Sequence, residues 1–171
     1  MRPSRGSAAL LVAVQVTSVI VTGLLTGGNV DRALIARPAW NRVGLVAWAD
    51  YTRHADLANG RYFYPALALS ATVLCVAAAV LWRRWKAGPA QAGLAIDLGA
   101  SCMLLCLPVS LEAAPFLLRL RGIDDTDVAG LRAAFEGSYV WGVGQTLLHS
   151  AAFVASVWGL AASRRGEGFG E

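Results

Sequence analysis

The sequence predicts an all-α fold: an integral membrane four-helix bundle with an extramembrane amphipathic helix between the first two spans. The 171 residues are 56% hydrophobic and 15% charged, with a mean hydropathy of +0.52, whereas soluble domains have about 25% charged residues. Four apolar segments are long enough for helices that cross a hydrocarbon core of about 30 Å. They run over residues 8–25, 62–82, 94–118 and 139–162. We therefore expect a single membrane domain over residues 1–171.

Basic residues predict the orientation of these spans. They lie near both chain ends and between the second and third segments: Arg2, Arg5, Arg83, Arg84, Lys86, Arg164 and Arg165. Short flanks rich in arginine and lysine stay in the cytoplasm, so we expect a multi-pass cell-membrane protein with both termini cytoplasmic. The net charge of +4 is dispersed, and the chain has one lysine, which argues against a nucleic-acid partner. The lipid bilayer is the predicted partner, and an oligomer stays open.

The cysteines and the short motifs bear on cofactors. Cys75, Cys102 and Cys106 contain no C-x-x-C pair, which excludes a quinone-linked thiol oxidoreductase with its redox centre here. The sequence also has no dinucleotide-binding, phosphate-loop or zinc-protease motif. We therefore predict no bound cofactor.

The connection between the first two segments, about residues 26–61, is too long for a passive turn. Gly27, Gly28 and Asn29 are residues that commonly end a helix, and Pro38 can begin the next one. Aromatic and apolar side chains then recur at helical spacing, at Trp40, Val43, Ala47 and Tyr51. This pattern predicts an amphipathic helix over residues 38–57 that covers the outer end of the bundle.

Three ionisable residues of this helix form a candidate site. Asp50 and His54 have the (i, i+4) spacing at which side chains touch, and a carboxylate beside an imidazole suits a general base. His54 and Asp56 resemble a metal-binding pair, but on a continuous helix they point in nearly opposite directions. A solvated interfacial face is the third interpretation. All three stay open, and no metal site is assigned.

Polar residues within the spans predict a second candidate site. One stripe of the first segment contains Gln15, Ser18, Thr22 and Thr26, and Asn29 extends it. One face of the third segment contains Asp97, Ser101, Pro108 and Glu112, and the opposite face contains Cys102 and Cys106. Trp141, Gln145 and His149 follow one another at intervals of four. Ionisable residues within spans are expensive and normally face a cavity or one another. We therefore expect Glu112, Gln145 and His149 to line one outward-facing pocket.

The layout resembles the anthrone-oxygenase-like membrane family of four-span proteins. The resemblance rests on Gly23, Gly27 and Gly28, on the segment Pro38-Ala39-Trp40, and on Trp48 and Tyr51. Arg37 stands where the family pattern leads us to expect a histidine. Most members have no known function, and the characterised branch resembles cofactor-free oxygenases that convert aromatic polyketide anthrones into quinones.

The resemblance implies a lipophilic aromatic substrate and a set of roles. A base removes a proton from the acidic methylene group of the anthrone, and the resulting carbanion then gives an electron to dioxygen. His54, beside Asp50, or His149 is the candidate base, with Glu112 to orient a histidine. Asn29 or Gln145 is the candidate oxyanion donor, and Trp40, Trp48 and Trp141, with Tyr51 nearby, are candidates for the slot that binds the rings. The alternatives are a non-catalytic membrane subunit and a binding protein for a lipophilic small molecule.

Overall fold

The computed structural model describes residues 5–85 and 88–165. The orientation was predicted partly from Arg2 and Lys86. These two residues lie outside the described residues, as does the side chain of Arg165. The helices are α1 (Arg5–Asp31), α2 (Arg37–Val43), α3 (Leu45–His54), α4 (Arg61–Trp85), α5 (Ala90–Leu118) and α6 (Val128–Arg165). Two π-helical turns, η1 (Arg32–Ala36) and η2 (Ala55–Gly60), and a 3-10 turn, η3 (Arg119–Arg121), join some of them.

These elements run end to end as four long rods: Arg5–Val43, Leu45–Trp85, Ala90–Arg121 and Val128–Arg164. All four are long and apolar enough to cross a membrane, which confirms the predicted all-α architecture with four such helices. The longest contains 41 residues, or roughly 60 Å at 1.5 Å per residue, about twice the thickness of a hydrocarbon core. Each of the four rods is therefore much longer than the minimum needed to cross the hydrocarbon core.

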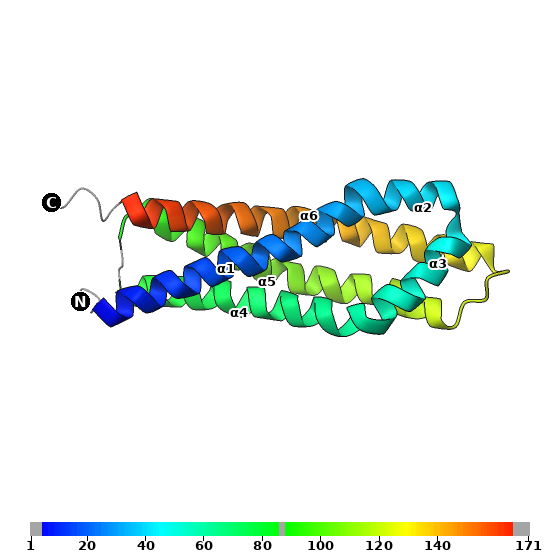
Figure 1. Ribbon diagram of the computed structural model, residues 1–171, viewed down its shortest axis with the longest axis horizontal. Helices are drawn as coiled ribbons and strands as arrows, with labels where there is room; N and C mark the ends of the chain where they lie inside the picture. The colour runs from blue at the N-terminus through cyan, green and yellow to red at the C-terminus, as the bar shows by residue number, and fades with distance from the viewer. Residues whose placement is uncertain (1–4, 86–87, 166–171) are drawn as a thin grey trace.

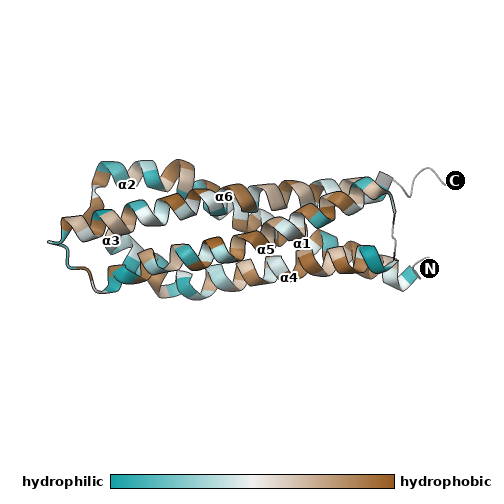
Figure 2. Cartoon of the chain, turned by 180° about the vertical axis from the view of Figure 1, so that it is seen from behind, coloured by the Kyte–Doolittle hydropathy of each residue, from teal (hydrophilic) through white to brown (hydrophobic). Residues whose placement is uncertain are grey.

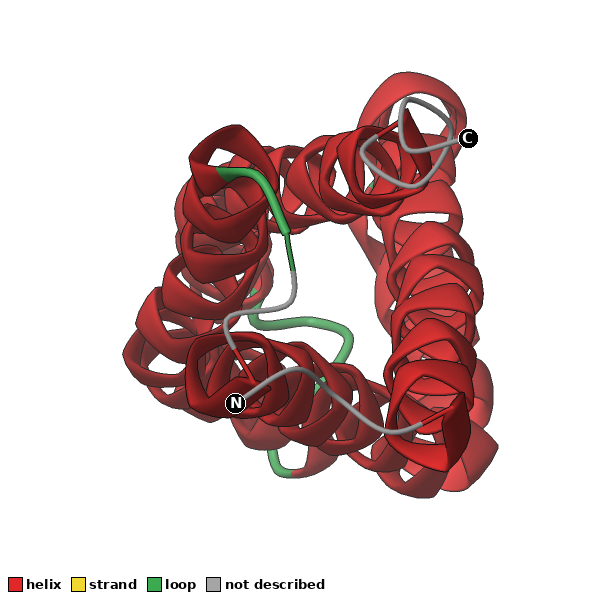
Figure 3. Cartoon of the chain, turned by 90° about the vertical axis from the view of Figure 1, so that its left-hand side faces the viewer, coloured by secondary structure: helices red, strands yellow, loops and turns green. Residues whose placement is uncertain are grey.

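Neighbouring rods pack along the bundle, and α3 of the second rod also contacts α6 of the fourth. Helices α1 and α5 both contact α4 and α6, and the view along the bundle shows the four rods around a square (Figure 3). The first residue of α1 and the last of α6 lie at the same end as the connection between α4 and α5 (Figure 1). We call this the terminal end, and the opposite end, where α2 meets α3, the distal end.

The half of the bundle nearer the terminal end has its own core of small and aliphatic side chains. Cys75, Cys102, Met103 and Ala152 are among its buried members. Gly99 lies where a Cβ atom would come within 3.2 Å of the Ser156 hydroxyl, so α5 and α6 approach closely there. Small residues at helix interfaces allow such contact.

The predicted polar stripe of α1 is confirmed, since Gln15, Ser18, Thr22 and Thr26 are all buried. The polar residues of α5 do share a face, but the expectation that this face points into the bundle is wrong. Cys102 and Cys106 point inward, Asp97 is half-buried, and Ser101, Pro108 and Glu112 are exposed. The reason is packing: α5 turns its small and thiol-bearing side chains toward α6, so its polar residues lie outside.

A second core fills the distal end. Its buried members are Trp48, Ala49, Leu57, Leu120, Leu131, Ala134 and Phe135, which come from α3, η2, η3 and α6. Hydrophilic residues are more frequent toward the ends of the bundle than along its middle (Figure 2). The distal segments thus continue the bundle with a core of their own.

The single helix predicted over residues 38–57 is wrong. The chain turns back at Gly44, whose φ of +98° is a conformation that glycine adopts without strain. Helix α1 also continues through Gly27 and Gly28, because packing along a bundle overrides the weak helix propensity of glycine. Helix α6 begins at Val128, earlier than the predicted span, and is continuous.

Candidate functional site

His149 lies between the two cores and is 4% exposed. The Asn29 side-chain amide donates a hydrogen bond to its Nδ1 over 2.8 Å, and Thr26 Oγ1 donates to its main-chain oxygen over 2.9 Å. A ring nitrogen that accepts a bond carries no proton, so the proton of neutral His149 is on Nε2. No ring lone pair then remains available, which makes His149 a poor general base in this arrangement.

The predicted pocket of Glu112, Gln145 and His149 is wrong as a shared site. Glu112 is exposed on α5, whereas His149 is buried. The Gln145 amide donates to the Ser110 hydroxyl over 2.9 Å. Trp141, expected on the same stripe, is half-buried. The interior cluster is therefore formed by α1 and α6, through Asn29 and His149, without a carboxylate.

Asp50 and His54 do touch, as their spacing predicts. His54 Nδ1 lies 3.3 Å from Asp50 Oδ1, and it lies 2.9 Å from the Asp50 main-chain oxygen. Both acceptors place the proton on Nδ1, so His54 Nε2 carries a free lone pair. The two side chains are 79% and 67% exposed, as the interpretation of a solvated face requires. His54 is consequently the histidine whose ring is prepared to accept a proton.

The metal interpretation gains no support within residues 5–85 and 88–165. No group of three or more histidine, cysteine or carboxylate side chains there could hold a metal ion. Asp56 is buried and pairs with Arg32, whereas His54 is exposed. The two residues thus have different environments.

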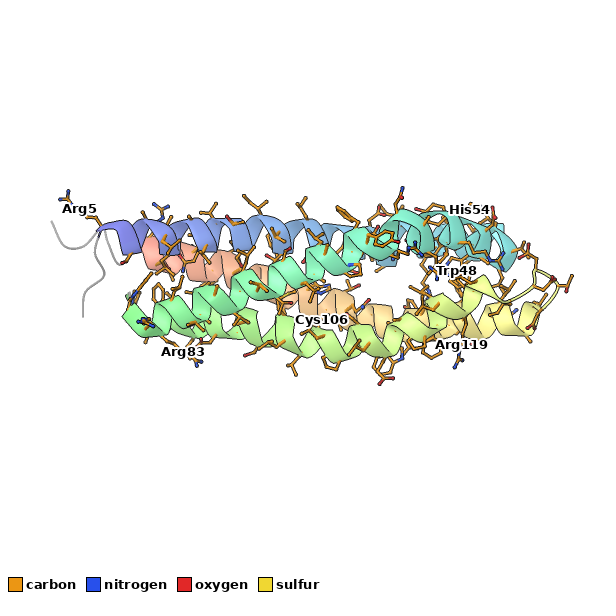
Figure 4. All side chains as sticks on the ribbon, turned by 90° about the horizontal axis from the view of Figure 1, so that it is seen from below. Arg5, Trp48, His54, Arg83, Cys106 and Arg119 are labelled. Carbon is orange, nitrogen blue, oxygen red and sulfur yellow. The ribbon has the colours of Figure 1, made fainter. Side chains whose placement is uncertain are left out.

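Of the predicted aromatic residues, Trp48 belongs to the core of the distal end and Trp40 packs against it. Trp48 is buried, with its ring centroid 4.8 Å from that of Phe135 and 6.4 Å from that of Trp40. Figure 4 shows Trp48 between the helices and His54 on the outer edge of the bundle. Tyr51 lies 5.9 Å from Trp40 but is exposed. Trp48 therefore stabilises the fold, and of this group Tyr51 remains accessible.

Arg37, which departs from the family pattern, lies against aromatic rings. Its guanidinium carbon is 2.9 Å from the ring centroid of Tyr139 and 4.6 Å from that of Phe135. This cation–π contact joins α2 to α6. The position has a packing role in this chain.

The ion pair between Arg32 and Asp56 was not predicted from the sequence. Arg32 begins η1, and Asp56 lies in η2, so each charge stands on one of the two π-helical turns. Such turns are frequent at functional sites. Arg32 also lies over the ring of Tyr64, 4.5 Å from its centroid. The ion pair therefore joins the first rod to the second on the distal side of their apolar segments.

A cleft of about 230 Å³ opens beside this ion pair. We call it the aromatic cleft, and it is lined by Tyr51, Ala55, Asp56, Asn59, Gly60, Phe63 and Tyr64. Three aromatic rings, one buried carboxylate and one amide are the mixture typical of small-molecule sites, with apolar walls and few polar groups. His54 directly precedes Ala55 in the chain but is not among the residues that line the cleft. Of the predicted site residues, Tyr51 lines it.

No protein-family model, curated protein or solved structure matches this chain.

Proposed function

We propose that this chain is an integral protein of the cell membrane with both ends in the cytoplasm. Four helices of sufficient length and apolarity support this proposal. Arg5, Arg83, Arg84 and Arg164 belong to segments at the terminal end, which is the cytoplasmic end by the positive-inside rule. About 20 residues of helix cross the hydrocarbon core, so a span that begins at Trp82 ends near Tyr62. The aromatic cleft then lies at the outer boundary of the membrane.

Labelling of introduced cysteines tests this orientation. Arg84→Cys and Val128→Cys place exposed thiols at the two ends of the bundle, and the three native cysteines are buried. An impermeant thiol reagent added to intact cells is expected to label only the Val128→Cys variant. Labelling of both variants from outside would contradict the proposed topology.

We further propose that the protein binds a lipophilic aromatic small molecule in the aromatic cleft. The observation that carries this proposal is the lining itself, with Tyr51, Phe63 and Tyr64 around a volume of about 230 Å³. A molecule dissolved in the outer leaflet would reach the cleft from the side. Stacking on aromatic rings contributes about 0.5–1.5 kcal/mol for each pair beyond the burial of area.

An oxygenase reaction of the anthrone type is the catalytic form of this proposal. His54 is then the general base, because its Nε2 carries a free lone pair and it directly precedes Ala55, which lines the cleft. Asp50 fixes its tautomer. His149 is not part of this form, because Asn29 occupies its Nδ1.

Titration of the purified protein in lipid nanodiscs with a planar aromatic probe, such as 2-naphthol, tests the binding proposal. Phe63→Ala is expected to raise the Kd about tenfold, since the loss of one stacked ring costs about 1.4 kcal/mol. Tyr62→Ala is the matched control, because Tyr62 is the adjacent exposed aromatic and does not line the cleft. Equal effects of the two substitutions, or no binding beyond that of empty nanodiscs, would reject the proposal in favour of a non-catalytic membrane subunit.

The catalytic form has its own measurement. Oxygen consumption with an anthrone is expected in the wild-type protein and in the Tyr62→Ala variant, and its loss is expected in His54→Ala. Binding without oxygen consumption would leave the function as a binding protein. Unchanged turnover in His54→Ala would remove His54 from the reaction.

A further inference from the structure

Asp56 is the one carboxylate that lines the aromatic cleft, and it is only 8% exposed. Its Oδ1 accepts a hydrogen bond from Arg32. Its second oxygen, Oδ2, accepts no hydrogen bond from any residue in the described part of the chain, and it keeps contact with solvent, since it is not one of the fully enclosed polar atoms without a partner. A buried carboxylate usually has all its acceptor positions satisfied. The cleft therefore contains a strong acceptor that is free to bind a ligand.

Arg32 fixes this acceptor and balances its charge. The guanidinium pairs with Asp56 and lies over the ring of Tyr64, but Arg32 is not itself among the lining residues. A cationic ligand would gain little from Asp56, because Arg32 already neutralises it. An anionic ligand would bring its charge against Oδ2 and would find no arginine in the lining to compensate.

We propose that Asp56 selects a lipophilic ligand whose polar end is a neutral hydroxyl group. The inference rests on the proposed function, and it adds a specificity residue and a ligand chemistry to it. The hydroxyl donates to Asp56 Oδ2, and the amide of Asn59, which also lines the cleft, donates to the same hydroxyl oxygen. The aromatic body lies between Tyr51 and Phe63. Hydrogen bonds to a charged group are about twice as strong as those between neutral groups.

Three ligands with the same naphthalene ring system separate these contributions: 2-naphthol has the donor, 2-methoxynaphthalene lacks it, and 2-naphthoate is an anion. Binding is measured by titration in nanodiscs, with the partition of each ligand into empty nanodiscs subtracted. The wild-type protein is expected to bind 2-naphthol at least tenfold more tightly than 2-methoxynaphthalene, and 2-naphthoate most weakly. Equal affinities for 2-naphthol and 2-methoxynaphthalene would overturn the assignment of Asp56 but leave the binding proposal intact. Failure of all three ligands to bind would overturn both.

The Asp56→Asn variant gives a second and independent result. It removes the negative charge and leaves the charge of Arg32 unbalanced, so the affinity for 2-naphthoate is expected to rise about tenfold while that for 2-naphthol falls. Phe63→Ala is the matched control, because it weakens all three ligands without changing their order. The comparison between ligands in the wild-type protein needs no variant, so it decides the matter even where Asp56→Asn does not fold. An unchanged order of affinities in folded Asp56→Asn would overturn the proposal.

Discussion

Arg53 fastens the distal end of the bundle, and its substitution should open that end without unfolding the rest. Its Nε donates to the main-chain oxygen of Leu120 over 2.9 Å, and its Nη2 donates to that of Ile123 over 2.7 Å. Nη1 pairs with Asp125 over 2.7 Å. One side chain of α3 thereby holds the connection between α5 and α6.

The magnitude follows from these contacts. A hydrogen bond from a charged donor contributes about 1.5–3 kcal/mol, and we take the lower end for the two bonds to main-chain oxygens. The pair with Asp125 adds about 0–1 kcal/mol, because Asp125 is 52% exposed. Arg53→Met should therefore cost the distal end about 3 kcal/mol, equivalent to about a 100-fold change in an opening equilibrium.

Hydrogen exchange measured by mass spectrometry on protein in nanodiscs is the assay. Amides in residues 45–54 and 119–131 are expected to exchange about 100-fold faster in Arg53→Met, with exchange in the core nearer the terminal end unchanged. Arg42→Met is the control, because Arg42 is exposed and makes no hydrogen bond or ion pair within the described residues. A change of less than about threefold, or equal acceleration along the whole chain, would refute the reasoning.

Three further predictions concern the turn at Gly44, the interior pair of Asn29 and His149, and the exposed Glu112. Gly44→Ala should destabilise the protein by about 1–3 kcal/mol because Gly44 has a positive φ. Gly27→Ala should not destabilise it, because Gly27 lies in a helix with open space around it. A lower melting temperature for Gly27→Ala than for Gly44→Ala would contradict this. Asn29→Ala and His149→Ala should be non-additive in stability by about 0.5–3 kcal/mol, since the two side chains bond directly. Glu112→Gln should change stability by less than about 0.5 kcal/mol and act independently of His149→Ala, and a measured coupling between them would restore the shared site.

The sequence predicted the features that depend on local spacing. The stripe of α1 follows from a helical period, which is why Thr22 and Thr26 are buried as expected. The contact between Asp50 and His54 follows from (i, i+4) geometry alone. Such features need no knowledge of which helix packs against which.

The inward face of α5 could not be predicted in the same way. Both faces of that helix have a regular pattern, one with Cys102 and Cys106 and the other with Ser101 and Glu112. The cost of a carboxylate facing lipid favoured the second face. That cost is small near the membrane boundary, where a side chain reaches water, and Glu112 is 20 residues beyond Ala92 on α5, close to the outer boundary proposed here. Close packing of small residues decided the face.

The ion pair of Arg32 and Asp56 was also missed, although the sequence has a signal for it. The two residues are 24 positions apart, and Gly44 lies midway between them. A turn at Gly44 brings them opposite each other when both arms are helical. A single continuous helix through Gly44 was predicted instead. In such a helix the segments before and after Gly44 cannot lie side by side, so Arg32 and Asp56 could not meet. The π-helical turns, which shift the helical register, have no comparable signal.

Photo-crosslinking tests whether the aromatic cleft is the ligand site. A naphthol that carries a small diazirine group is irradiated with the protein in nanodiscs, and the labelled peptides are identified by mass spectrometry. Label is expected in residues 51–64, with competition by excess 2-naphthol and loss of label in Phe63→Ala but not in Tyr62→Ala. Competable label concentrated instead around Gln145 and His149 would contradict it.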